Sequence, residues 1–119
     1  MNVMVIGASN KPERYSYMAV ERLLIAGHQV FPVHPRLVDV LGLSVFASVA
    51  EVKEPIHTVT LYVNAETSSK MAADILALNP KRILFNPGAE NKALFDEAKK
   101  KGLEVKEACT LVLLSTGQF

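Results

Sequence analysis

The sequence is poor in residues that stabilise small secreted proteins or ligate metals. Tryptophan is absent, cysteine occurs once, and only 7% of the residues are aromatic. The single Cys109 excludes an internal disulfide, and no Cys/His spacing typical of a metal site occurs. No apolar run approaches the roughly 20 residues that a membrane helix needs. The first residues also lack the basic segment and long apolar core of a secretory signal, so we expect a cytoplasmic location.

An excess of charge of one sign is also lacking. The chain has 13 Lys and Arg residues against 12 Asp and Glu, which gives a net charge of +1. Nucleic-acid-binding domains usually carry a clustered basic excess, so binding to nucleic acid is not expected. An anionic ligand must therefore be held by a local cluster of residues and not by the field of the whole protein.

Hydrophobic residues, by contrast, make up 50% of the sequence. They are mostly aliphatic and suffice for one substantial core. The length of 119 residues fits a single domain that covers residues 1–119. No internal repeat, low-complexity segment or linker divides the chain.

Short β-branched runs alternate with helical patterns along the chain. Strands are predicted at 3–6, 28–33, 58–63, 82–85 and 103–106. Helices are predicted at 16–26, 67–78 and 91–101, a short edge segment at 43–46, a helical turn at 48–52, and an apolar element of open type at 110–114. Such alternation is typical of βαβ units with right-handed crossovers. We therefore expect an α/β fold, a three-layer, Rossmann-like, doubly wound parallel sheet of about five strands, for which 3-2-1-4-5 is the usual order.

The chemically distinctive residues follow the predicted strands. In open parallel sheets, ligands bind outside the carboxyl ends of the strands, so these residues are expected to meet at one edge. The segments are 7–14, 34–36, 64–65, 86–91 and 108–110.

The first of these segments has the composition of a phosphate-binding turn. Gly7 permits a tight turn, and the small Ala8 and Ser9 let a ligand approach the backbone. Free amides and the following helix N-terminus attract an anion, to which Lys11 and Arg14 add charge. The alternative is a simple turn with two solvated cations, because the segment is not a complete GxGxxG.

The second segment distinguishes between nucleotide ligands. NAD-binding domains normally place Asp or Glu after the second strand to hold the ribose hydroxyls. This chain has His34, Pro35 and Arg36 there. A cation suits a phosphorylated ribose, either the 2′-phosphate of NADP or the 3′-phosphate of coenzyme A. A surface arginine after a turn is the alternative.

Two later segments have structural as well as functional interpretations. The turn at Pro87 and Gly88 shapes the entry into a helix and also lies where a ligand cleft would have a wall. Cys109 follows the fifth predicted strand, where packing, contact with a ligand and nucleophilic catalysis all stay open. No paired histidine or second cysteine supports catalysis there.

Several short pieces of the chain carry a family resemblance. They are VIGASNKPER at 5–14, VFPVHP at 30–35, LG at 41–42, VFASV at 45–49, FNPGAEN at 85–91 and ACT at 108–110. Together, and over nearly the whole chain, they resemble the small bacterial CoA-binding-domain proteins. The chain is also similar to the CoA-binding domain of the succinyl-CoA synthetase alpha subunit, without the domain that carries a phosphorylated histidine. It departs from the family pattern at His34, often Asn, at His57, often Asp, and at Ala108, often a basic residue.

The resemblance implies a role for each segment. The first loop would hold phosphates, and Pro35 and Arg36 would flank the adenosine 3′-phosphate. Val63 and Asn64 would lie beside the adenine or pantetheine, and residues 87–88 would line the far wall. Together with the residues considered above, the expected ligand-binding residues are Gly7, Ala8, Ser9, Lys11, Arg14, His34, Pro35, Arg36, Val63, Asn64, Pro87, Gly88, Asn91 and Cys109.

The leading interpretation is a protein that binds coenzyme A or an acyl-CoA without catalysis of its own. One alternative is an NADP-linked reductase or a small acyl-CoA-handling enzyme, although no Ser-His-Asp arrangement or substrate domain supports it. Another is a regulatory protein that senses a nucleotide and docks onto a partner through the apolar 110–114 segment. The expected partner is a small nucleotide cofactor, with neither nucleic acid nor membrane. A homodimer or an unknown protein partner stays open.

Overall fold

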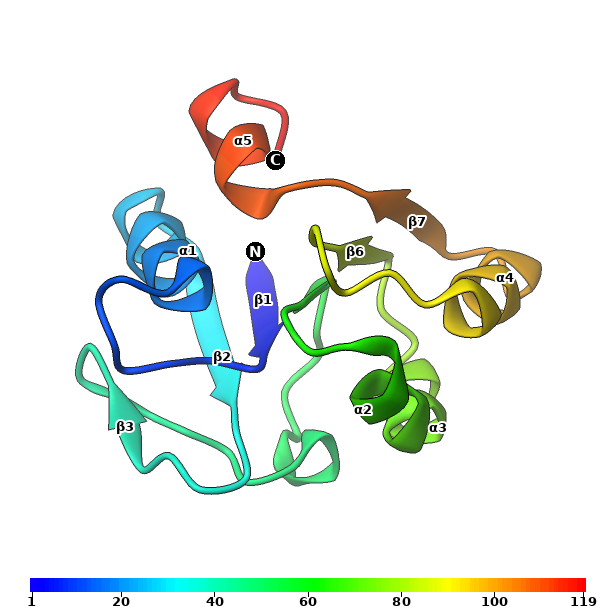
Figure 1. The fold of residues 1–119 in the computed structure, drawn as a ribbon, viewed down its shortest axis with the longest axis horizontal. Helices are drawn as coiled ribbons and strands as arrows, with labels where there is room; N and C mark the ends of the chain where they lie inside the picture. Colours follow the sequence, from blue (N-terminus) through cyan, green and yellow to red (C-terminus); the bar gives the residue numbers. More distant parts are fainter.

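Five parallel strands form the central sheet of the computed structural model, which describes residues 1–119 (Figure 1). The strands are β1 (Asn2–Ile6), β2 (Gln29–Val33), β5 (Thr58–Leu61), β6 (Arg82–Phe85) and β7 (Glu104–Glu107). Their order is β2-β1-β5-β6-β7, and every neighbouring pair is parallel. The chain therefore passes from β1 to β2 on one side and then returns past β1 to β5 on its other side. This confirms the predicted α/β fold.

A short segment extends the sheet on the outer side of β2. Phe46 forms an isolated parallel bridge with Val33. Its amide donates to the Pro32 carbonyl at 2.9 Å, and the His34 amide donates to the Phe46 carbonyl at 3.0 Å. With this segment counted as a strand, the order is 3-2-1-4-5-6, which contains the expected 3-2-1-4-5 and adds one strand; the five regular strands alone follow 2-1-3-4-5. Of the edge segment predicted at 43–46, only Phe46 pairs with the main sheet, while Leu43 and Ser44 pair in a separate hairpin.

The chain before this bridge forms a small hairpin. β3 (Asp39–Val40) and β4 (Leu43–Ser44) pair antiparallel, and the tip residues Leu41 and Gly42 both have positive φ, 50° and 80°. Positive φ at both positions is the pattern of a two-residue type I′ turn. Val40 is buried in the core, so the hairpin packs against the domain and does not project from it.

Helices cover both faces of the sheet (Figure 1). One face carries α1 (Tyr15–Ile25) and α5 (Thr110–Ser115). The other face carries α2 (Ala65–Lys70), α3 (Ala72–Ala77), α4 (Lys92–Lys100) and the short 3₁₀ turn Val49–Glu51. No helix combines the length and the apolar character needed to cross a membrane.

The alternation of side chains along β1 divides the core into two clusters. Val3 and Val5 pack with Val20 of α1 on one side of the sheet. Met4 and Ile6 point to the other side, into the cluster that contains the buried residues of α3 and α4. These four side chains of β1 are all buried, which explains why the strand is apolar from Val3 to Ile6: both of its faces are covered.

The helix predicted at 67–78 is the main difference from the sequence prediction. The structure divides it into α2 and α3 at Met71. It also begins earlier, because the Asn64 side chain accepts a hydrogen bond from the Thr67 amide at 2.9 Å and caps α2. The open element at 110–114 is the helix α5, and the other predicted elements agree within one or two residues.

Candidate functional site

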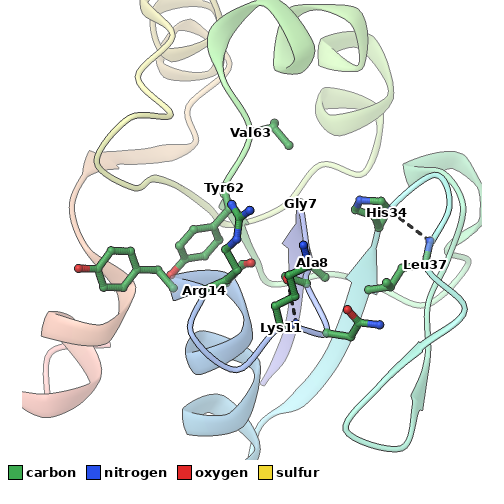
Figure 2. A pocket seen from close by; sticks show the side chains of 12 residues that line it. Gly7, Ala8, Lys11, Arg14, His34, Leu37, Tyr62 and Val63 are labelled. Carbon is green, nitrogen blue, oxygen red and sulfur yellow. Dashed lines mark hydrogen bonds between the residues drawn. The ribbon is translucent and has the colours of Figure 1, made fainter.

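A cleft of about 590 Å³ opens at the carboxyl ends of β1, β2 and β5 (Figure 2). It lies where the chain passes to opposite sides of β1, which is the usual place for ligands in open α/β sheets. The cleft is lined by Gly7, Ala8, Ser9, Asn10, Lys11, Arg14, Tyr15, Ser16, His34, Leu37, Tyr62 and Val63.

Gly7 brings the ends of β1 and β5 into close contact at the floor of the cleft. Its φ is +87°, a conformation that favours glycine. A Cβ atom at this position would lie 2.8 Å from Cγ1 of Val63 and 3.0 Å from the carbonyl oxygen of Tyr62. The floor therefore requires glycine both for its backbone conformation and for the space it leaves.

The amides of the first loop divide into two groups. Those of Gly7 and Ala8 both donate to the Val33 carbonyl, at 3.0 and 3.3 Å, and so extend the pairing of β1 with β2. The amides of Ser9 and Asn10 have no acceptor in the protein. The Ser9 hydroxyl accepts from the Lys11 amide at 3.1 Å and fixes the turn. Only the outer part of the loop therefore has amides free for a ligand.

The N-terminus of α1 adds further free donors. Arg14 occupies the N-cap position without a capping hydrogen bond from its side chain. The amides of Tyr15, Ser16 and Tyr17 have no acceptor in the protein, and the first two of these residues line the cleft. Unpaired amides at the positive end of a helix dipole form a site for an anion.

The charged side chains in the cleft wall are Lys11 and Arg14. Neither forms a salt bridge, and no carboxylate lines the cleft. Figure 2 shows the Arg14 and Lys11 side chains at different points of the wall. The wall is therefore positively charged, although the whole molecule is close to neutral.

His34 at the exit of β2 has a fixed hydrogen-bonding role. Its Nδ1 accepts from the amides of Arg36 and Leu37, both at 3.1 Å (Figure 2). A nitrogen that accepts these bonds carries no proton, so the neutral ring has its proton on Nε2. An asparagine oxygen is able to accept the same amides in an Asx turn. Histidine thus preserves the turn where the resemblance leads one to expect asparagine, and it offers a donor through Nε2.

A family model described as "CoA binding domain" matches residues 1–115. The chain belongs to the CoA-binding domain family. A crystal structure of an uncharacterized protein is 40% identical, with a TM-score of 0.94 over 99% of this chain and 97% of that chain. The uncharacterized protein YneT of Bacillus subtilis (strain 168) is 27% identical, over 87% of this chain and 76% of its own length.

The fold of this CoA-binding domain also occurs inside a larger enzyme. The dinucleotide-forming acetyl-coenzyme A synthetase 1 of Ca. Korarchaeum cryptofilum matches with a TM-score of 0.75 and 20% identity. The match covers 90% of this chain and 25% of that one. At this level of identity the likeness shows a shared fold alone.

The cleft of the CoA-binding domain brings together only some of the predicted ligand-binding residues. Those in its wall are Gly7, Ala8, Ser9, Lys11, Arg14, His34 and Val63. Pro35 and Arg36 are exposed on the turn directly after His34, beside the wall. Asn64, Pro87, Gly88 and Cys109 follow the ends of β5, β6 and β7, further along the same edge of the sheet.

Asn91 lies outside the cleft because the fold uses both ends of its side-chain amide. Its oxygen accepts from the Leu94 amide at 3.1 Å and caps α4. Its nitrogen donates to the hydroxyls of Ser68 at 2.8 Å and Ser69 at 3.1 Å. Asn91 is buried and joins α4 to α2.

Tyr62 lines the cleft but was absent from the residues predicted for it. Burial raises the pKa of its phenol to about 12; the nearby hydroxyls of Thr110 and Thr60 lower that pKa, and Cys109 raises it. Neither threonine forms a hydrogen bond with the buried Tyr62 oxygen. The phenol is therefore neutral at physiological pH. The only sequence signal was its position directly after a buried strand.

A buried polar network fixes the far part of the edge. The Asn86 side chain donates to the Thr60 hydroxyl at 2.7 Å and to the Leu61 carbonyl at 2.8 Å. Its oxygen accepts from the Thr110 amide at 2.8 Å, and the Thr60 and Thr110 hydroxyls are 2.7 Å apart. The network connects the ends of β5 and β6 with the start of α5, and so holds Cys109 at the edge.

Proposed function

We propose that this protein binds coenzyme A or an acyl-CoA, with the nucleotide half of the ligand in the cleft at the ends of β1, β2 and β5. Membership of the CoA-binding domain family supports this ligand class. The free amides and unpaired cations of the cleft supply the groups that a diphosphate needs. We also propose that the protein contributes no catalysis of its own.

The main support for this ligand comes from two residues that follow β2, His34 and Arg36. A ribose with two free hydroxyls is normally held there by a carboxylate, which accepts hydrogen bonds. In this protein His34 Nδ1 is occupied by two amides and Nε2 donates. Arg36 is exposed on the same turn. A donor and a cation suit a phosphorylated ribose and give a free ribose diol no acidic acceptor.

The diphosphate would lie on the first loop and the N-terminus of α1. Ser9 and Asn10, whose amides are free, line the same cleft as Tyr15 and Ser16, whose amides are also free. Lys11 and Arg14 would balance the charge. The pantetheine arm would then pass Val63 and continue along the carboxyl edge toward the ends of β6 and β7, roughly 10–14 Å from β1 given the spacing of neighbouring strands.

The hydrogen bonds of the cleft support a binding role without catalysis. A serine nucleophile needs a base that accepts its proton. The acceptor nitrogen of His34 is already bound by backbone amides, and the Ser9 hydroxyl contacts the Lys11 amide. The cleft also has no carboxylate to act as a base.

Parallel calorimetric titrations with CoA, acetyl-CoA, dephospho-CoA, NADP and NAD test the proposed ligand. We expect CoA to bind more tightly than NAD, because only CoA carries a ribose phosphate for the β2 exit. Dephospho-CoA should fall between them. NAD binding as tight as CoA binding, or tighter, would contradict the proposal.

A further inference from the structure

The carboxyl edge of the sheet is divided into halves of opposite charge. The loops after β1 and β2, residues 7–14 and 34–37, form the inner edge and contain Lys11, Arg14 and Arg36 against the single acid Glu13. The outer edge consists of residues 64–67 and 86–91, which follow β5 and β6, and residues 107–109, which begin with the last residue of β7. Their only charged residues are Glu66, Glu90 and Glu107.

The three outer carboxylates are exposed, and one of them has a defined position. Glu90 Oε1 accepts a hydrogen bond from the Gly88 amide at 3.0 Å, so its carboxylate is held over the turn that follows β6. Glu107 ends β7, whose register places it directly beside Phe85 at the end of β6. These two carboxylates therefore belong to neighbouring strand exits.

No free cation compensates the charge of the outer edge. The Lys92 amine lies 2.7 Å from Asp96, and the Lys106 amine lies 3.4 Å from Glu104. Lys70 lies in the last turn of α2, away from the edge. Tyr62, between the two halves, is neutral because burial raises its pKa to about 12. Apart from the helix N-termini that begin there, a negative charge placed on the outer edge would meet three carboxylates and no free cationic side chain.

Coenzyme A has a matching asymmetry. Its negative charges are all on the phosphates of the nucleotide half, and its thiol end is uncharged. The inner edge therefore suits the nucleotide, and the pantetheine arm brings the thiol, or an acyl group on it, over the outer edge.

We infer that the outer edge makes this site selective for the free thiol and for uncharged acyl groups, and that it disfavours acyl groups with a free carboxylate. The inference rests on the proposed function and deepens it. At a separation of about 7 Å and ordinary salt, screened repulsion from one carboxylate near a protein surface weakens binding by about five- to tenfold.

Butyryl-CoA and succinyl-CoA provide the direct test, since both carry four-carbon acyl groups and only succinyl has a terminal carboxylate. Calorimetric titration of the full chain should show butyryl-CoA binding at least about fivefold more tightly. The ratio should fall as salt is raised, because exposed charges are screened.

Variants separate charge from the difference in apolar character. Glu90→Gln keeps an acceptor for the Gly88 amide, and it should reduce the ratio severalfold. Glu107→Gln should act in the same direction. Glu54→Gln is the matched control: Glu54 is exposed and precedes β5, at the opposite edge of the sheet, and the ratio should not change.

The outcomes distinguish the proposed acyl-group selectivity from the proposed CoA binding. If CoA binds as proposed but succinyl-CoA binds as tightly as butyryl-CoA, the inference alone is overturned. An unchanged ratio in both Glu90→Gln and Glu107→Gln would also overturn it. If neither CoA nor any acyl-CoA binds, the proposed function fails and the selectivity fails with it.

Discussion

Arg36 is the residue on which the choice of ligand can be tested most directly. If the adenosine 3′-phosphate lies at the exit of β2, Arg36→Ala should weaken CoA binding by about 1.5–3 kcal/mol, the range for a hydrogen bond to a charged group. Calorimetry measures the loss. Dephospho-CoA should lose much less, because it lacks this phosphate. Arg22→Ala, an exposed arginine near the end of α1, is a control that should leave both affinities unchanged. Equal losses for the two ligands in Arg36→Ala would show that Arg36 acts elsewhere.

Some residues of the cleft could be predicted from the local sequence, whereas others depend on contacts with distant parts of the chain. Gly7, Ser9 and His34 were predicted at one edge because loops that follow parallel strands must meet there, and all three line the cleft. Tyr62 was missed, because its environment depends on α5, which packs there through hydrogen bonds between residues 24 to 50 positions apart. Asn91 was expected to bind ligand because it belongs to the family-like segment 85–91. Its partners on α2 are 22 to 26 positions away and are invisible locally.

The contact between α4 and α2 depends on Asn91, so its replacement should lower the stability of the fold. Asn91→Ala removes the cap of α4 and leaves buried partners of its side chain unsatisfied, so the free energy of unfolding should fall by about 1–3 kcal/mol. Urea unfolding at an unchanged m-value measures this loss. Asn64→Ala is the matched control, since Asn64 caps α2 through one bond at an exposed position. A loss in Asn91→Ala no greater than in Asn64→Ala would contradict the structural role of Asn91.

At the scale of elements, periodicity predicted which segments are strands and helices better than where helices begin or break. β6 was predicted with its observed bounds because Arg82–Phe85 is a short β-branched and apolar run before Asn86-Pro87. The division at Met71 has no signal of its own, since neither glycine nor proline marks it. The helix α5 remained undetermined, because an apolar run of this length fits a buried strand as well as a helix.

The whole molecule should become more stable when the cleft is occupied. A ligand that binds only the folded state at 100 times its Kd stabilises that state by about 2.7 kcal/mol. For a domain of this size, this corresponds to an increase in Tm of roughly 10 °C. Thermal unfolding with CoA and with NAD at equal concentrations measures the difference. An equal or larger increase with NAD would contradict the proposed ligand preference.

The bridge at Phe46 attaches one wall of the cleft to the sheet through only two hydrogen bonds. On the β5 side, Gly7 packs closely against Tyr62 and Val63. On the β2 side, only two backbone hydrogen bonds at Phe46 join the 34–46 segment to the sheet. We expect the 34–46 segment to open more easily than the β5 side, and its amides therefore to exchange faster in the free protein. The amides of His34 and Phe46 should therefore gain more protection from deuterium on ligand binding than those of Tyr62 and Asn86, which pair within the central strands.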